Sequence, residues 1–280
     1  MPVWNCEASL ALAIRSIIRQ TYGNWELLII DDGSEDGTLD VAREFRDPRI
    51  LVQSDGLHLG LPARLNQAIE LGRGAYFARM DGDDVSYPRR LERQLDYIRQ
   101  HREVDLIGAW MLVFGQEGIP IGKRAGPETH SDICRNPSAG FHLGHPTYLG
   151  RTSFFREHWY RATAIRCEDQ DLLLRSYRRA RFANVPEILL GYREERIDLG
   201  KILTGRRYFA RSLFRQFQEQ GRPSLGVMAV AGQIVKAVAD CIAIGTGLNY
   251  RILRHRARPI TAAEQEEWTK VWMLVNAEEL

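Results

Sequence analysis

Cysteine and net charge are both scarce in this 280-residue sequence. Its four cysteines lie far apart and form no CxxC pair, so neither a zinc site nor a disulfide framework is indicated. The formal net charge is only +2, and the first half contains no Lys/Arg block interleaved with aromatics, so we expect no nucleic-acid partner. The N-terminus also lacks a basic segment followed by an apolar core, and the sequence therefore predicts a cytoplasmic protein.

Short apolar runs alternate with helical patterns in the first two thirds of the chain. The run Leu27–Ile30 ends in Asp31-Asp32, and the run Ala75–Met80 ends in Asp81-Gly82-Asp83-Asp84. This alternation predicts an α/β fold with a mostly parallel sheet and helices on both faces. Ligands bind beyond the carboxyl ends of such strands, so we expect both acidic clusters at one crevice. Further helices are expected at 8–18, 38–45, 65–71, 88–101 and 171–181, and further strands at 50–52, 104–114 and 188–192.

The acidic cluster Asp81-Gly82-Asp83-Asp84 offers hard oxygen ligands at a strand end. Such ligands suit Mg²⁺ or Mn²⁺, and a cation held by few protein groups keeps positions open for phosphate oxygens. That arrangement stabilises a diphosphate leaving group. The alternative is an Asp/Gly turn in which Asp84 caps the following segment, and Asp31-Asp32-Gly33-Ser34 is open to the same interpretation.

Three further positions have both a functional and a structural interpretation. The pair Glu168-Asp169 offers a carboxylate that can act as general base, or it is an acidic helix start favoured by the helix dipole. His145 contacts the acceptor or has a structural role. Arg64 contacts phosphate or is a solvated surface arginine.

The C-terminal part of the chain, residues 198–280, differs in character from residues 1–197. Between Lys201 and Arg258, eleven lysines and arginines stand against two acidic residues. Residues 225–248 are apolar except for a stripe at helical spacing formed by Gln233, Lys236 and Asp240. A membrane-spanning helix rarely carries such a stripe. Two interpretations stay open: an amphipathic helix resting on an anionic inner leaflet, or a helix packed on the catalytic domain with a solvated basic face.

Several motifs together resemble the family 2 glycosyltransferases, which are inverting enzymes of the GT-A fold. The resemblance covers about residues 1 to 195. It rests on Pro2-Val3-Trp4-Asn5, Ser16–Tyr22, Glu26–Ser34, Ala78–Asp84, Pro88, Arg90-Leu91, His145-Pro146-Thr147 and Glu168-Asp169.

The resemblance implies a role for each matching donor-side position. Pro2 and Trp4 stand where the family's PVYN-like segment lies against the nucleotide base, and Asp32 matches the aspartate that bonds the base edge. Asp83 matches the metal-binding aspartate of the DxD motif, with Asp81 as its partner toward the donor.

The resemblance also implies the reaction and its partners. Asp169 matches the aspartate that deprotonates the acceptor hydroxyl, with Glu168 and His145 on the acceptor side. The implied reaction is transfer of a single sugar, with inversion, from a nucleoside-diphosphate sugar, by default a UDP-sugar, to a glycan or lipid-linked acceptor. Mn²⁺ or Mg²⁺ is the implied cofactor, and surface polysaccharide synthesis at the inner face of the membrane is the implied setting.

Two departures from the family pattern bear on these expectations. The family has an apolar strand before the PVYN-like segment, so we expect its absence before Met1 to expose apolar surface on neighbouring strands. No QxxRW-like segment follows Asp169, which favours single-sugar transfer over processive synthesis. The alternatives are a catalytically impaired relative that binds a nucleotide sugar, partner or membrane, and a sugar-nucleotide pyrophosphorylase, for which Leu57–Leu61 is a poor glycine-rich loop.

Overall fold

The structure is a computed structural model that describes residues 1–194, 198–246 and 257–277. The boundary predicted at Ile197 and the basic residues Arg251, Arg254 and Arg256 lie outside these ranges.

The N-terminal part forms a three-stranded parallel sheet in the order β1-β2-β3. Its strands are β1 (Pro2–Val3), β2 (Leu27–Asp31) and β3 (Ile50–Ser54). The crossovers are α1 (Glu7–Ile18) and α2 (Thr38–Glu44), which pack against each other. Every residue of β2 is buried, as its continuous apolar sequence predicts for the central strand of a parallel sheet.

The second sheet is mixed, with the strand order β4-β8-β6-β9-β5 and β7 paired to β6. Its long central strands, β6 and β9, run parallel, and the other pairings are antiparallel. The expected mostly parallel sheet is thus a parallel sheet beside a mixed one. A short connection between β6 and β7 forces the chain to return antiparallel, and β8 is too short to show as an apolar run. The strands are β4 (Tyr76–Ala78), β5 (Val85–Ser86), β6 (Leu106–Phe114), β7 (Pro120–Arg124), β8 (Leu149–Arg151) and β9 (Phe182–Arg193).

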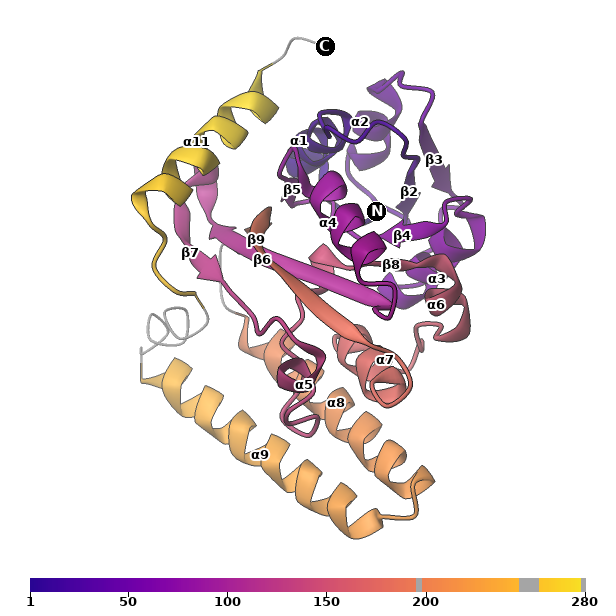
Figure 1. Cartoon of the computed structure of the whole chain (residues 1–280), viewed down its shortest axis with the longest axis vertical. Helices are drawn as coiled ribbons and strands as arrows, with labels where there is room; N and C mark the ends of the chain where they lie inside the picture. The colour runs from indigo at the N-terminus through magenta and orange to yellow at the C-terminus, as the bar shows by residue number, and fades with distance from the viewer. Residues whose placement is uncertain (195–197, 247–256, 278–280) are drawn as a thin grey trace.

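Helices pack around both sheets (Figure 1). The buried face of α4 packs on β6 and β9, and α7 contributes leucines to the largest core cluster. The helices of residues 61–176 include two single-turn 3-10 helices. The bounds are α3 (Leu61–Leu71), α4 (Arg90–Gln100), α5 (His130–Ile133), α6 (Thr152–Glu157), α7 (Glu168–Ser176) and the single-turn η1 (Gln116–Gly118) and η2 (His145–Thr147).

A cavity of about 600 Å³ separates the two sheets, between β2 on one side and β4 on the other. Its lining includes Leu27, Leu28, Tyr76 and Phe77, and the amino group of Met1 donates to the Leu28 carbonyl at 2.8 Å. We expected apolar side chains here to be exposed. They are instead buried or half-buried, because residues of α1, α3 and α4 line the same cavity.

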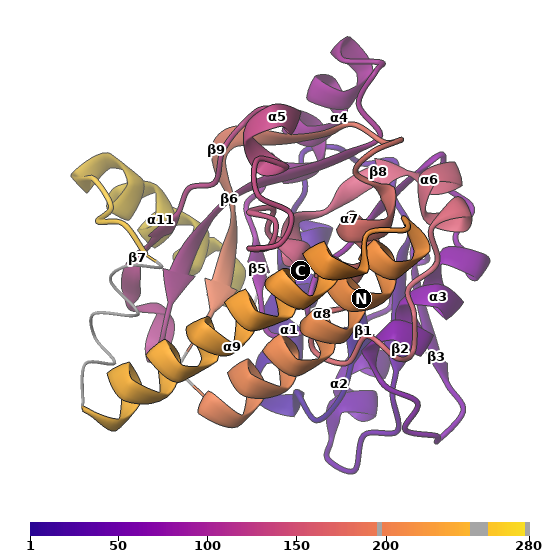
Figure 2. The same ribbon diagram turned by 90° about the horizontal axis from the view of Figure 1, so that it is seen from below.

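Of the C-terminal helices, α11 (Ala262–Asn276) lies beside β7 of the mixed sheet, and α8 (Leu199–Glu219) and α9 (Pro223–Gly245) lie on the side of α5 and α7 (Figures 1 and 2). α8 and α9 lie antiparallel side by side, with α9 on the outside. Phe209 and Leu213 of α8 join the same core cluster as the leucines of α7. The buried Trp268 of α11 packs against Phe114 of β6.

The polar stripe predicted on α9 exists, and it faces the protein. Gln233 is buried and donates to the Ser138 carbonyl at 2.8 Å, Lys236 donates to the Ala139 carbonyl at 2.9 Å, and Asp240 pairs with Arg206. The opposite face is apolar and open to solvent. Its side chains are between 52% and 69% exposed, namely Val227, Met228, Ile234, Val235, Val238 and Ile242.

In the described ranges, α9 is the one helix whose length and composition allow it to cross a membrane. Its most apolar window has a mean hydropathy of 1.8, and 11% of that window is buried. Lys236 and Asp240 are its only charged residues, and both point toward the protein. Exposed apolar faces of this kind are common at protein or membrane contact sites.

Candidate active site

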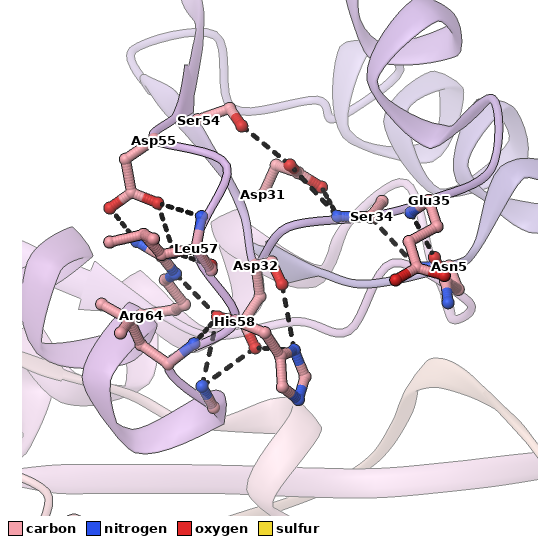
Figure 3. Close-up of polar contacts among 12 residues, drawn as sticks. Asn5, Asp31, Asp32, Ser34, Glu35, Ser54, Asp55, Leu57, His58 and Arg64 are labelled. Atoms are coloured by element: carbon pink, nitrogen blue, oxygen red, sulfur yellow. Dashed lines mark hydrogen bonds and ion pairs between the residues drawn. The ribbon is translucent and has the colours of Figure 1, made fainter.

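Asp32 follows β2 and is held in a dense set of hydrogen bonds (Figure 3). Its carboxylate accepts from the backbone N–H groups of Leu59, at 2.7 Å, and of Gly60. Gly60 has a φ of +86°, which lets the chain turn into α3 directly beneath this carboxylate. The carboxylate is thereby fixed at the carboxyl end of the central parallel strand.

Arg64, in the first turn of α3, is buried behind Asp32. Its Nε lies 2.8 Å from Asp32 Oδ1, and its Nη2 lies 2.6 Å from Asp55 Oδ1. The side chain is 1% exposed, so the interpretation as a solvated surface arginine is wrong. Its guanidinium is directed at these two carboxylates, and it orients Asp32 from behind.

An exposed aromatic platform lies next to Asp32. Trp4 is 52% exposed, and its ring lies 4.7 Å from that of His58, centroid to centroid. His58 Nδ1 is 3.0 Å from the Asp32 carbonyl oxygen and 3.1 Å from the Asp32 carboxylate. No sequence pattern indicated His58, because it comes from the loop before α3 and no motif includes it. Pro2, two residues before Trp4, is buried in β1 and pairs with Ile30 of β2.

Asp31 serves a different purpose from its neighbour. Its carboxylate accepts from the Ser34 N–H at 3.2 Å and from the Ser54 hydroxyl at 2.8 Å. The same turn is closed by Asn5, whose side chain accepts from the Glu35 N–H at 2.9 Å. The turn interpretation therefore applies to Asp31, whereas Asp32 lies at the platform.

The second acidic cluster follows β4, as expected. Asp81, Asp83 and Asp84 each offer a ligand atom, and these atoms all lie within 4.8 Å of one another. Asp84 is buried and accepts from the Arg193 N–H at 3.0 Å, and its Oδ2 has no hydrogen-bond partner in the described part of the chain.

The charge state of this cluster suits a cation. Burial, followed by the charge of Asp81, raises the pKa of Asp83 to about 6. Burial, followed by the charges of Asp81 and Asp83, holds the pKa of Asp84 well above its usual range. Carboxylates crowded in this way repel one another, and a divalent cation on their oxygens relieves that repulsion. The residues present therefore fit a hard metal ion.

Arg79 lies at the centre of the site and was missed as a functional residue, although the sequence motif includes it. It is 4% exposed and pairs with Asp81, and its Nε and Nη1 have no hydrogen-bond partner within the described residues. Its positive charge opposes the upward shifts in the pKa values of Asp83, Glu168 and Asp169. The two acidic groups, far apart in sequence, thus share one buried cation.

Glu168 and Asp169 begin α7. Burial, followed by the charge of Asp169, raises the pKa of Glu168 to about 7. Burial also raises the pKa of Asp169, although a hydrogen bond of 2.9 Å from the Gln170 side chain opposes this. A half-buried carboxylate of raised pKa at the edge of an acidic site has the properties of a general base.

His145 has the surroundings of a structural residue. It is buried, and its Nε2 lies 3.0 Å from the Tyr160 hydroxyl. Its Nδ1 lies 3.9 Å from Glu168, and burial holds its pKa well below the ordinary value. A neutral, enclosed imidazole at this place supports Glu168 from behind.

The arrangement defines a class of protein. Carboxylates at the strand ends of an α/β domain, an exposed aromatic platform at one side and a basic carboxylate at the other are features of transferases that use nucleotide-activated substrates. The sequence model described as glycosyl transferase family 2 matches residues 1–159, more than half of the chain. The chain belongs to glycosyl transferase family 2.

Relatives of this chain carry consistent names. It is 38% identical over 202 residues to the putative glycosyltransferase EpsE of Bacillus subtilis. That match covers 70% of this chain and 72% of EpsE. It is 30% identical over 142 residues to a β-1,3-glucosyltransferase of Escherichia coli, WfgD, named for UDP-Glc and α-D-GlcNAc-diphosphoundecaprenol. That match covers 50% of this chain and 55% of WfgD.

Solved structures confirm the fold. The S. aureus TarS structure of residues 1–349 in complex with UDP-GlcNAc superposes with a TM-score of 0.63 at 17% identity. The match covers 98% of this chain and 79% of the TarS chain. The fold is therefore the GT-A fold that the sequence predicted, with C-terminal helices included in the match.

Proposed function

We propose that this protein is a metal-dependent, inverting glycosyltransferase that moves a single sugar from a UDP-sugar to a glycan or lipid-linked acceptor. The observation that carries this proposal is the convergence of two acidic groups on Arg79, one at the end of β4 and one at the start of α7. One group suits a diphosphate-bound cation, and the other suits a base. The names of the relatives and the nucleotides bound to TarS support the same reaction class.

The donor nucleotide binds at the platform. Trp4 offers an exposed ring for stacking on the base, which every nucleobase accepts. Asp32, held rigid by Arg64 and the turn into α3, offers carboxylate oxygen to the N–H groups of the base edge. Uracil presents such an N–H, as do thymine and guanine, and we favour UDP because the structurally similar TarS is solved with UDP and UDP-GlcNAc.

Asp83, with Asp81 and Asp84, would hold the cation, Mn²⁺ or Mg²⁺. When bound, such an ion supplies Lewis-acid stabilisation of the charge that develops on the leaving diphosphate. Asp81 also keeps the charge of Arg79 at this end of the site. Because Arg79 is fixed and buried, it contributes to stabilising negative charge without reorganising.

Asp169 acts on the acceptor. Its carboxylate takes the proton from the acceptor hydroxyl as the hydroxyl oxygen bonds to the anomeric carbon of the donor. The bond between that carbon and the diphosphate oxygen breaks on the opposite face, so the product has inverted configuration. Glu168 lies on the acceptor side beside Asp169, and His145 Nδ1 lies 3.9 Å behind the Glu168 carboxylate.

We propose that residues 198–280 attach the catalytic part, residues 1–197, to the inner face of the cytoplasmic membrane. The outward face of α9 is apolar, and the neighbouring helix α8 carries exposed arginines at helical spacing, namely Arg207, Arg211 and Arg215. Because the polar stripe of α9 is bonded to the protein, the helix lies on the bilayer surface. A lipid-linked acceptor would be presented at that surface.

The alternative is an impaired relative that binds a nucleotide sugar without transfer. The presence of Asp32, Asp83 and Asp169 in supported positions favours an enzyme. A test is the release of UDP from UDP-Glc and UDP-GlcNAc with Mn²⁺ and undecaprenyl-diphosphate-linked GlcNAc, for the wild type, Asp169→Asn and the surface control Glu70→Gln. Transfer by the wild type and Glu70→Gln, and a loss of at least about 100-fold in Asp169→Asn, is expected. Binding of UDP by a wild type that transfers nothing would favour the alternative.

A further inference from the structure

A loop that no motif includes lies against the catalytic end of α7. Residues 138–141 belong to the connection between α5 and η2, and Gln170 holds them through two hydrogen bonds. The Gln170 Oε1 accepts from the Phe141 N–H at 2.7 Å, and its Nε2 donates to the Phe141 carbonyl at 3.2 Å. The same Nε2 donates to the Asp169 carboxylate at 2.9 Å. One amide group therefore contacts both the base and the loop.

The backbone of the loop is shaped to allow this approach. Gly140 has a φ of +109°, a conformation that other residues rarely adopt. A Cβ at this position would lie 3.0 Å from the Gln170 Oε1. The close contact between the loop and Gln170 thus depends on glycine at position 140.

The outer helix α9 holds the same loop from the other side. Gln233 donates to the Ser138 carbonyl at 2.8 Å, and Lys236 donates to the Ala139 carbonyl at 2.9 Å. The polar residues of α9 therefore bond to this loop and to Arg206. The loop contacts α9 on one side and, through Gln170, Asp169 on the other.

We propose that Gln170 is a positioning residue that fixes the Asp169 carboxylate to loop 138–141 and so links α9 to the catalytic base. The proposal rests on the role proposed above for Asp169. Among the described residues, Gln170 is the side chain that donates a hydrogen bond to Asp169, so it sets the orientation of the carboxylate. Movement of α9 on a bilayer would reach the base through three consecutive hydrogen-bonded contacts.

Other charged and titratable groups also face Asp169. They are Glu168 beside it on α7, Arg79 from the segment after β4, Tyr148 from the end of η2 and Tyr160 from the segment after α6. Gln170→Leu replaces none of them and adds no charge, so a change in the pKa of Asp169 in that variant reports the lost hydrogen bond.

The experiment compares the wild type with Gln170→Leu and Gln170→Glu, without nucleotide. The pKa of Asp169 is measured by carbon NMR of labelled aspartates, assigned by difference with Asp169→Asn, and amide exchange is measured at Phe141. In Gln170→Leu we expect the pKa of Asp169 to rise by about one pH unit and exchange at Phe141 to become about ten-fold faster. In Gln170→Glu the pKa rises, while Phe141 stays protected because the carboxylate still accepts its N–H.

The control is Gln100→Leu, an exposed glutamine at the end of α4, which should change neither quantity. An unchanged pKa of Asp169, or unchanged exchange at Phe141, in a folded Gln170→Leu would overturn the proposal. If Gln170→Leu does not fold, Gln170→Met, which also lacks the amide and adds no charge, decides the pKa, and Gln233→Leu decides the contact between α9 and the loop by its faster exchange at Phe141.

Kinetics separate this proposal from the proposed function. Gln170→Leu should lower kcat about ten-fold and leave the KM for the UDP-sugar within about two-fold, because the platform at Trp4 and Asp32 is untouched. A wild type that transfers no sugar contradicts the proposed function and leaves the NMR result to decide the contact. An active wild type with equal kcat in Gln170→Leu contradicts the positioning role alone.

Discussion

Replacing Glu168 by glutamine is expected to stabilise the protein above pH 7 and to change its stability little at pH 5. Glu168 is buried at the start of α7, and burial, followed by the charge of Asp169, raises its pKa from 4.5 to about 7. The unfolded chain ionises this carboxyl near pH 4.5. Between pH 4.5 and 7 the folded protein therefore retains a proton that the unfolded chain has released, and the free energy of unfolding falls as pH rises.

The size of the effect follows from the same pKa. Each pH unit in this interval lowers the free energy of unfolding by about 1.4 kcal/mol. The ionisable Glu168 therefore lowers it by roughly 3 kcal/mol at pH 8 and by less than about 1 kcal/mol at pH 5. Glutamine fills the same space and cannot ionise. For a chain of this length, about 2 °C per kcal/mol gives a melting temperature about 6 °C higher for Glu168→Gln at pH 8.

Thermal unfolding of the wild type and Glu168→Gln at pH 5 and pH 8 measures this difference. Glu70→Gln, an exposed position on α3, is the matched control and should melt with the wild type at both values. The reasoning is refuted if Glu168→Gln gains the same amount at both pH values, or if it melts below the wild type at pH 8.

Three other substitutions, with Arg73→Met as a control, test the platform, the buried ion pair and the outer face of α9. Trp4→Ala should weaken UDP binding about ten-fold in calorimetric titration, because base stacking contributes about 1–3 kcal/mol. Unchanged affinity would contradict stacking of the base on Trp4. Arg64→Met should lower the free energy of unfolding in urea by about 3–5 kcal/mol, because it leaves Asp32 buried without its partner. The exposed Arg73→Met should cost less than about 1 kcal/mol, and equal costs would contradict the buried ion pair. Val235→Asp should reduce cosedimentation with anionic phospholipid vesicles, and full binding would exclude the outer face of α9 as the contact.

Much of the fold was predictable from apolar periodicity. The expected strand at 27–30 and helix at 8–18 appear as β2 and α1, because one is buried on both faces and the other on one face. The short strand β8, with three residues, gave no pattern. The antiparallel pairings of the mixed sheet depend on such short strands, so the sequence overestimated how parallel the sheet is.

The site was predictable where function lies in strand-end motifs. Asp32 and the cluster that includes Asp83 lie where the strand ends indicated. His58 contacts Asp32 and Gln170 contacts Phe141 across long stretches of sequence, which periodicity does not report. The roles of the individual site residues and the domain boundary at Ile197 stay predictions.

The polar stripe on α9 shows a different limit of sequence analysis. Its spacing placed Gln233, Lys236 and Asp240 on one helical face, which the structure confirms. The spacing did not indicate that this face turns inward. Hydrogen-bond acceptors in loop 138–141 and Arg206 on α8 determine the orientation, and both depend on the tertiary fold.

The most direct test of the central claim is the melting temperature with UDP in the presence of Mn²⁺ or EDTA, for the wild type and Asp83→Asn. At a hundredfold excess over Kd, binding to the folded state contributes about 2.7 kcal/mol, which raises the melting temperature by about 5 °C. The account predicts this rise for the wild type with Mn²⁺, its reduction by EDTA and its loss in Asp83→Asn. A wild type that melts cooperatively at the same temperature with and without UDP and Mn²⁺ would contradict it.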